Sequence, residues 1–574
     1  MRTLSRRVTA LLLTVLTVLL ATGCVAIPES SAPQPIKEFN RALPTDLVPT
    51  PRRSDDPETL VRNFLKASAD PDSGHRAARR FLTAGASGRW DDTGPMTVLD
   101  DVRVVVDERS ESAVRLRIIG ATTGELSPEG RLTPAQGRTT VPLNLIRVNG
   151  AWRINGDLPT GAITDLAQFE AAYRSANLYY PDRTVTHLVS DPRWFYGASI
   201  SPTDLIVRLL AGPSDNLTGA VSSSGDIQMH GPVDVDGSDV RISLGGLTES
   251  DTRYRTMIAA QLIWTLAGAG IRGTYQITAD GGPLVPERQA GWEMADVKSF
   301  DPDPDQGTPP LHLVRDGGLY RVGPSGPVAV QGVLGAAHDL RAAAISADQQ
   351  WVTAVAQRGD RQVLVRGRYG EDVAEVLSGA VIATPSFGAG AQTGFAVVDG
   401  KPSLWTADAD TGEVRASELD VSEVTAAAPG PITAMKVSPD GVRVVLLVGG
   451  KVMLAVISTN DRGLPALTGV YPAAYGIDTP VVSLTWGGPE SVYVARQGEE
   501  TPVMRIPLSG LPVVPMVSGN LKPPVLSIAA GRSSVFVGDS RTVLVLRTSS
   551  GSQDQYWTGV DDVAAGTVPV VPGS

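Results

Sequence analysis

The pattern of hydrophobic and polar positions divides the chain into three kinds of segment. Residues 8–21 form one unbroken run of small and apolar residues. Between residues 57 and 295, stretches with apolar residues three or four positions apart alternate with stretches of period two, which predicts mixed helices and strands. From residue 311 onward only strand patterns remain. We therefore expect a multidomain protein with α+β regions followed by an all-β region.

The first α+β domain is predicted over residues 57–160. Asp56 suits a helix N-cap and Pro57 the first helical position. Apolar residues then recur on one helical face, at Leu60, Val61, Phe64 and Leu65. A second short helix is expected over 77–84, carrying Phe81 and Leu82. Strands follow at 102–106, 114–119, 141–147 and 152–155, the last two joined by the hairpin signal Asn149-Gly150. No convergent His/Asp pair is visible in this domain.

The second α+β domain is predicted over residues 161–295. After a strand at 186–189, Ser201 and Pro202 are expected to start a helix that ends at Gly212-Pro213. A hairpin turning at Asp236-Gly237 follows, and Ser250 is expected to cap a long helix. A last strand at 273–279 completes the order β-α-β-β-α-β.

The segment 296–310 is an acidic, proline-rich linker. Asp301, Asp303 and Asp305 stand at alternate positions, as in a calcium loop. Prolines interrupt them, however, and His312 stands where a bidentate Glu should close the loop. A solvated linker is therefore favoured over a calcium site.

Residues 311–574 show an internal repeat of strands. Inner-strand signals recur about 40–50 residues apart, the spacing of four-stranded propeller blades, at 343–346, 384–387, 435–438, 483–486 and 526–529. Strands at 312–315 and 319–322 and a strand at 567–571 lie at opposite ends of this region. Pairing between them would close a sixth blade and remove the sheet edges. We expect six blades, with five or seven as alternatives, while the regular period disfavours an array of Greek-key sandwiches.

The N-terminus has the pattern of a lipoprotein signal. Arg2, Arg6 and Arg7 precede the apolar run, which is too short for a membrane span of about 20 residues but suits a signal peptide. Ala21-Thr22-Gly23-Cys24 follows and holds the only cysteine of the chain. This is typical of a bacterial lipobox, although Ala21 stands where Leu is usual. We predict a signal peptide over 1–23, with general secretion slightly favoured over twin-arginine export.

Lipidation of Cys24 would place the protein on the outer face of the cytoplasmic membrane. Residues 24–56 are rich in proline and are expected to form the tether between anchor and folded domains. A plain secretory signal with an incidental cysteine is the alternative.

The formal net charge of −11 over 574 residues argues against nucleic acid as a partner. It also argues against an electrostatic attachment to anionic lipid, so the acyl group must provide the anchor. With a single cysteine, neither an internal disulfide nor a cysteine-based zinc site can form.

Candidate catalytic and metal-binding residues are sparse. The five histidines, His75, His187, His230, His312 and His338, are scattered and never stand at ligand spacing on one helix. Gly538-Asp539-Ser540 resembles a serine-hydrolase block but falls where a turn between strands is expected. The glycine-rich segment 388–394 precedes no helix, so phosphate binding is not expected there. Asp234, Asp236 and Asp239 are expected to be solvated hairpin residues. We predict no enzyme activity, no cofactor and no metal.

The order of the parts resembles the actinobacterial lipoprotein LpqB family over essentially the full length. The first domain resembles the nuclear-transport-factor-like α+β cone. The second resembles the GerMN domain, through "LLAGPSDNL" after its first helix and "QLIWTL" with "GIRGTYQIT" in its second half. The resemblance implies an accessory lipoprotein of the Mtr two-component system that contacts the extracytoplasmic part of the sensor kinase MtrB. It thereby implies an influence on the response regulator MtrA, on cell-wall metabolism and on division. Cys24 is the only functional residue that this resemblance implies.

Two function classes remain open at this point. The protein is either a regulatory module that binds a sensor kinase, or an envelope protein that binds a peptidoglycan or glycan fragment. An exposed apolar surface would favour the first class, and an aromatic-lined concave pocket would favour the second.

Overall fold

The computed structural model describes residues 48–574, apart from 224, 305–306, 478, 550–551 and 574. Residues 46–574 form one compact unit. The lipobox prediction, Ala21, Thr22, Gly23 and Cys24, therefore lies outside the described residues. Within the described part of the chain, no helix is long and apolar enough to span a bilayer.

The N-terminal α+β region packs three helices and a curved six-stranded sheet around one core. Its sheet has the order β5-β4-β2-β1-β6, with β3 paired to β2. Register shifts along β1 and β2 accompany the curvature. The elements are α2 (Pro57–Ser68), α3 (Asp72–Arg79), α4 (Ala84–Arg89), β1 (Met96–Arg109), β2 (Ala113–Leu126), β3 (Leu132–Pro134), β4 (Arg138–Val148), β5 (Ala151–Ile154) and β6 (Ile163–Asp165).

The predicted start of the first helix is confirmed, but the second helix was wrongly placed. Asp56 caps α2 by accepting a hydrogen bond from the Thr59 backbone N–H at 2.8 Å. Phe81 and Leu82 lie between α3 and α4 instead of inside a helix. Leu82 forms a β-bridge with Ile154, which holds the chain extended there.

The second domain surrounds a sheet of order β10-β11-β12-β13, with β9 paired to β11. A separate two-stranded sheet, β7-β8, precedes it. The elements are α5 (Leu166–Ala172), β7 (Tyr173–Pro181), β8 (Leu188–Tyr196), α6 (Pro202–Leu210), β9 (Gln228–Met229), β10 (Asp234–Asp236), β11 (Asp239–Gly245), α7 (Thr252–Gly268), β12 (Thr274–Ala279), β13 (Gly282–Pro283) and the 3₁₀ helix η1 (Met294–Phe300).

One of the two predicted helix caps in this domain is confirmed. Ser201 accepts a hydrogen bond from the Asp204 backbone N–H at 3.3 Å and caps α6. The long helix α7 begins one residue later than predicted. Asp251, not Ser250, caps it by accepting from the Tyr254 N–H at 2.8 Å.

The C-terminal region is a β-propeller of six sheets. In five of them the first strand of the blade lies innermost and contacts the innermost strands of the neighbouring blades. The first three of these five blades consist of β17 (Leu340–Ile345), β18 (Trp351–Arg358), β19 (Arg361–Arg368) and β20 (Val373–Gly379); β21 (Ile382–Phe387), β22 (Thr393–Val398), β23 (Lys401–Ala407) and β24 (Val414–Glu418); and β25 (Ile432–Val437), β26 (Arg443–Val448), β27 (Lys451–Thr459) and β28 (Pro465–Pro472). The short helix α8 (Ser422–Ala427) precedes β25.

The next two blades consist of β29 (Val481–Trp486), β30 (Ser491–Arg496), β31 (Val503–Pro507) and β32 (Val514–Pro515), and of β33 (Ser527–Ala530), β34 (Ser534–Gly538), β35 (Val543–Ser549), β36 (Ser552–Gln553) and β37 (Thr558–Gly559). All five predicted inner strands therefore fall on the first strands of blades.

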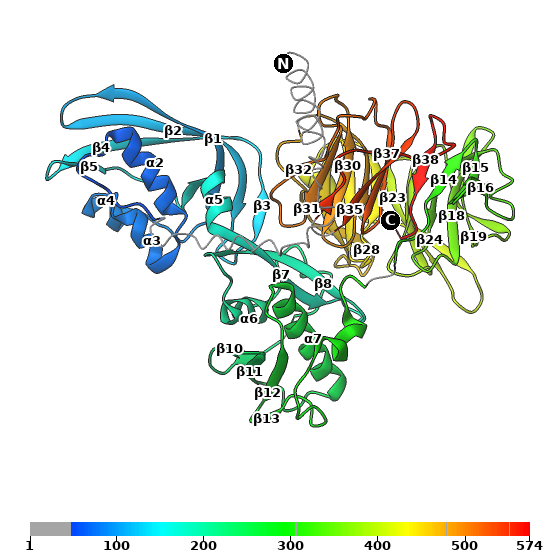
Figure 1. Cartoon of the computed structure of the whole chain (residues 1–574), viewed down its shortest axis with the longest axis horizontal. Coiled ribbons are helices and arrows are strands. Elements are labelled where there is room, and N and C mark those ends of the chain that lie inside the picture. The colour runs from blue at the N-terminus through cyan, green and yellow to red at the C-terminus, as the bar shows by residue number, and fades with distance from the viewer. Residues whose placement is uncertain (1–47, 224, 305–306, 478, 550–551, 574) are drawn as a thin grey trace, which may run out of the picture. The chain divides into compact units, whose positions relative to one another are not determined.

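The sixth blade joins the two ends of the propeller sequence, as predicted. It has the order β16-β15-β14-β38, so the last strand of the chain is its innermost strand. β38 pairs antiparallel with β14 through Leu313 and Pro569, and Figure 1 shows the red strand beside the green one. The strands are β14 (His312–Arg315), β15 (Gly318–Gly323), β16 (Gly326–Ala329) and β38 (Val568–Val570).

His312 lies in this closing blade and is 1 % exposed. Its Nδ1 is 3.0 Å from the Pro310 carbonyl oxygen, and its Nε2 is 2.7 Å from the Tyr369 hydroxyl. A neutral imidazole satisfies both contacts by donating from Nδ1 and accepting at Nε2. Burial lowers the pKa of His312 from its ordinary value of 6.5 to about 4.

This buried histidine predicts a loss of stability in mild acid. Above pH 6.5 the imidazole is neutral in both folded and unfolded chains, so it adds no pH dependence. As the pH falls from 6.5 towards 4, only the unfolded chain binds the proton, and the free energy of unfolding decreases by on the order of 3 kcal/mol. Urea unfolding at several pH values measures the free energy of unfolding as a function of pH. Between pH 6.5 and 4 this free energy should decrease less steeply for His312→Gln than for the unmodified protein. The same pH dependence in both proteins would contradict the prediction.

Candidate functional site

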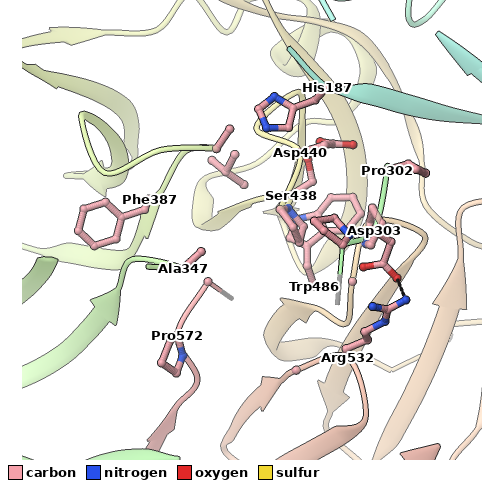
Figure 2. Close-up of a pocket in the computed structure, with 18 of the residues that line it drawn as sticks. His187, Pro302, Asp303, Ala347, Phe387, Ser438, Asp440, Trp486, Arg532 and Pro572 are labelled. Atoms are coloured by element: carbon pink, nitrogen blue, oxygen red, sulfur yellow. Dashed lines mark hydrogen bonds and ion pairs between the residues drawn. The ribbon is translucent and has the colours of Figure 1, made fainter. Parts of the chain in front are cut away.

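The clearest candidate site is a cavity of about 190 Å³ at one mouth of the propeller channel. It lies where the innermost strands of the blades end, so every blade contributes to its wall. Figure 2 shows Phe387, Trp486, Ala347 and Pro572 around the opening. The wall combines apolar residues such as Ile345, Val437 and Ala530 with polar and charged ones such as Ser438 and Asp440.

Trp486 is the largest side chain of this wall, but it is not an exposed platform. It is 1 % exposed, and its Nε1 donates a hydrogen bond to the Lys436 carbonyl oxygen at 2.9 Å. Its ring belongs to the core between the blades that begin with β25 and β29. Trp486 therefore packs the propeller core.

The linker lies at the same mouth, which the sequence did not predict. Asp301, Pro302 and Asp303 line the cavity, and Asp303 forms an ion pair with Arg532 at 3.0 Å (Figure 2). The side chains of this pair are 39 % and 48 % exposed, so it contributes at most about 1 kcal/mol. The linker, which the sequence predicts to be solvated, is thus held against the propeller by this ion pair. The composition of the linker alone does not predict the contact.

A buried ion pair beside the cavity connects the propeller to the second domain. Asp440 and Arg443 are 3.3 Å apart, and both side chains are 3 % exposed. The Arg443 guanidinium also donates to the Ser190 carbonyl oxygen of β8. The apolar core of the second domain extends to Val442 and Val456 of the propeller. These two parts of the chain therefore share buried polar and apolar contacts.

A second polar contact joins the same parts at the β29–β30 turn. Glu490 accepts hydrogen bonds from the Asn177 amide at 2.6 Å and from the Tyr179 hydroxyl at 3.2 Å. Burial raises the pKa of the Glu490 carboxyl above its ordinary value. Nearby, the Trp194 Nε1 donates to the Ser509 carbonyl oxygen at 2.9 Å.

The structure gives the other sequence candidates structural roles. Asp234, Asp236 and Asp239 surround Arg241 at 2.8, 3.8 and 3.6 Å, so a guanidinium occupies the place where a cation would bind. Asp539 accepts backbone hydrogen bonds in the turn between β34 and β35. The described residues include no group of three or more His, Cys, Asp or Glu side chains placed to hold a metal ion.

One pair of polar residues was missed by the sequence analysis. His75 and Asp92 line a second cavity, in the N-terminal region, and the Asp92 charge acts on the imidazole. The expectation that this domain has no convergent His/Asp pair was therefore wrong. Sixteen residues, which include helix α4, separate the two positions, so no periodic or motif signal links them.

Comparisons with known proteins agree with this division of the chain. Three family models match it: "Lipoprotein LpqB, N-terminal domain" over residues 50–170, "Sporulation and spore germination" over 177–285, and "Lipoprotein LpqB beta-propeller domain" over 317–572.

Curated relatives match nearly the whole chain. "Lipoprotein LpqB" of Rhodococcus opacus is 35 % identical and covers 96 % of each chain. "Lipoprotein LpqB" of Mycolicibacterium smegmatis is also 35 % identical, covering 98 % of this chain and 100 % of the relative.

Among solved structures, TolB from Acinetobacter baumannii is 14 % identical with a TM-score of 0.34 and covers 50 % of this chain and 74 % of its own. The apo AztD of Citrobacter koseri is 10 % identical with a TM-score of 0.27, covering 46 % of this chain and 98 % of its own. Likenesses this weak support no inference about function.

Proposed function

Because this chain belongs to the lipoprotein LpqB family, we propose that it binds the extracytoplasmic sensor domain of an Mtr-type histidine kinase and modulates its signalling. In this proposal, acylated Cys24 anchors the protein at the outer face of the cytoplasmic membrane. The kinase contact then affects cell-wall metabolism and division. The protein acts by binding, without catalysis, cofactor or metal. The N-terminal α+β region is assigned to the nuclear-transport-factor-like class, for which its curved sheet and packed helices are the support.

The observation that carries the proposal is the difference between the two ends of the propeller. In an antiparallel blade, the connections after the first and third strands lie at one end, and those after the second and fourth lie at the other. Arg443, Glu490 and Ser509, which contact the second domain, all belong to the first end.

The opposite end carries more exposed apolar side chains than the first end, where Leu464 on the β27–β28 connection is 55 % exposed. Val333, Val381 and Leu526 lie on connections from one blade to the next and are 42 %, 59 % and 60 % exposed. Exposed apolar side chains at one end of a rigid domain are a favourable surface for a protein partner. We assign this end to the kinase.

Modulation requires that the protein bind two states of the sensor domain with different affinities. A ligand shifts a conformational equilibrium only by that difference in affinity. A regulatory role therefore needs no catalytic residue.

The test is calorimetric titration of residues 25–574, without lipid, into the purified sensor domain of the kinase. Val381→Asp and Leu526→Asp should each weaken binding at least tenfold, because each places a charge in the contact. Val235→Asp is the matched control, since Val235 is 46 % exposed on the second domain, and it should leave the Kd unchanged. Absence of heat at millimolar concentrations would refute direct contact, and unchanged Kd values for both propeller variants would refute the assigned surface.

The glycan-binding alternative has weaker support at the channel mouth. Its cavity of about 190 Å³ is smaller than ligand pockets of about 300–1,000 Å³. The linker also occupies part of the opening. Titration of wall fragments in the same calorimeter distinguishes this alternative from the kinase contact.

A further inference from the structure

The second cavity has a volume of about 410 Å³, within the range of small-molecule sites. It lies beside α3, between the loop that precedes β1, the end of β2 and residues of β7, β8 and α6. The proposed kinase contact does not use it. Its lining combines an aromatic wall with a few buried polar atoms.

The polar wall presents two hydrogen-bond acceptors. His75 is 7 % exposed, and its ring bonds to the Ser68 backbone through one nitrogen. The other nitrogen, Nδ1, is buried and has no hydrogen-bond partner among the described residues. Burial lowers the pKa of His75, so the imidazole is neutral near pH 7 and Nδ1 is an acceptor.

Asp92 supplies the second acceptor. Its Oδ1 forms an ion pair with Arg79 at 2.9 Å, whereas its Oδ2 is buried without a partner among the described residues. Buried polar atoms are nearly always hydrogen-bonded, and an unpaired one costs free energy. A ligand that donates hydrogen bonds to both atoms would therefore be favoured.

The aromatic wall has no free donor from Tyr173 and Trp194, which are 4 % and 6 % exposed, and the half-buried Tyr196 provides its accessible ring. Tyr173 donates to the Ala69 carbonyl oxygen at 3.0 Å, and Trp194 donates to the Ser509 carbonyl oxygen. The Tyr173 and Tyr196 rings are 5.6 Å apart, and Phe169 packs behind Tyr173 and Trp194. Such a wall suits the C–H face of a ligand.

The backbone holds His75 in an unusual conformation. Ser73, Gly74 and His75 have consecutive φ values of 52°, 66° and 51°, in the left-handed region that residues with a side chain rarely adopt. Conformations of this kind concentrate at ligand-binding sites, where the surrounding structure fixes a side chain in place. Here the turn fixes the imidazole at the cavity wall.

We propose that this cavity binds a saccharide unit. Ring hydroxyls donate to His75 Nδ1 and Asp92 Oδ2, and the C–H face of the sugar packs on the aromatic wall. A sugar combines several donors with an apolar face, which matches both walls. Arg208 also lines the cavity and adds a cationic donor to its wall, and the described residues place too few ligands together here for a metal ion.

The experiment uses saturation-transfer NMR and tryptophan fluorescence on residues 25–574. The probes are glucose, galactose, N-acetylglucosamine and its β1→4 disaccharide, with spermidine as a non-saccharide donor. We expect saturable binding of at least one sugar with a Kd of millimolar or tighter. His75→Asn and Asp92→Asn should each weaken it at least tenfold, and Asn is chosen at position 75 because it tolerates the left-handed backbone.

Two matched controls separate loss of the site from loss of folding. Ser73→Asn changes a neighbouring left-handed residue outside the lining, and Asp157→Asn removes another Asp–Arg pair of the same length, 2.9 Å, in the same domain. Both should bind the sugar as the unmodified protein does, with thermal melts confirming that all four variants fold. The proposal would be overturned if no sugar binds, if spermidine alone binds, or if His75→Asn and Asp92→Asn bind the sugar as tightly as the unmodified protein does.

Discussion

Removal of residues 567–574 is expected to open the propeller and to lower the temperature at which it unfolds. These residues contain β38, the innermost strand of the closing blade, which contacts β14, β17 and β33. Val570 and Val571 are 5 % and 2 % exposed, and full burial of each valine is worth about 1.5–3 kcal/mol. Their loss lowers the free energy of unfolding by at least about 3–6 kcal/mol, which corresponds to a decrease in Tm on the order of 10 °C. Differential scanning calorimetry would measure it.

A peptide complementation experiment provides the control for this deletion. A synthetic peptide of residues 560–574, added to the truncated protein, should pair with β14 and restore the higher Tm. A peptide with the same composition in scrambled order should not. A truncated protein that unfolds at the original Tm would show that the ring does not depend on β38.

Substitution of Arg443 by Met is expected to lower the free energy of unfolding by about 3–5 kcal/mol. It would leave the Asp440 carboxylate buried without its cationic partner, a change that costs this amount in other proteins. It would also remove the hydrogen bond to the Ser190 carbonyl oxygen. Chemical denaturation measures the change. Limited proteolysis should additionally show cleavage between the second domain and the propeller.

Two variants test whether the uncompensated charge is the cause. Arg361→Met breaks an exposed pair with Glu375 and should cost at most about 1 kcal/mol. Adding Asp440→Asn to Arg443→Met removes the stranded charge and should recover part of the loss. A cost below about 1 kcal/mol for Arg443→Met itself would contradict the argument.

Local signals account for the features that the sequence predicts well. Asp56 and Ser201 cap their helices through hydrogen bonds to residues three positions ahead, so the motif and the contact occupy the same few residues. The inner strands of the propeller repeat at a regular spacing, and five of the six blades form from strands that are consecutive in the sequence. Ser250 was wrongly predicted to cap α7 because Ser250 and Asp251 are adjacent and both residue types form N-caps. The sequence alone does not decide between them, and in the structure Asp251 is the cap.

The candidate sites depend on contacts that no local signal encodes. Arg443 and Ser190 are 253 residues apart, and Trp194 reaches Ser509 across 315. The orphaned acceptors of His75 and Asp92 are visible only once the helices have packed. One sequence, without an alignment, supplies hydrophobic periodicity and turn chemistry but not the partner of an individual side chain.

The closing blade also determines when the chain can finish folding. A polypeptide is synthesised from its N-terminus, so β14 emerges some 250 residues before the strand that pairs with it. Until then the ring has two open sheet edges, which are prone to mispairing. Ring closure therefore waits for β38 and cannot be completed by the first five blades alone.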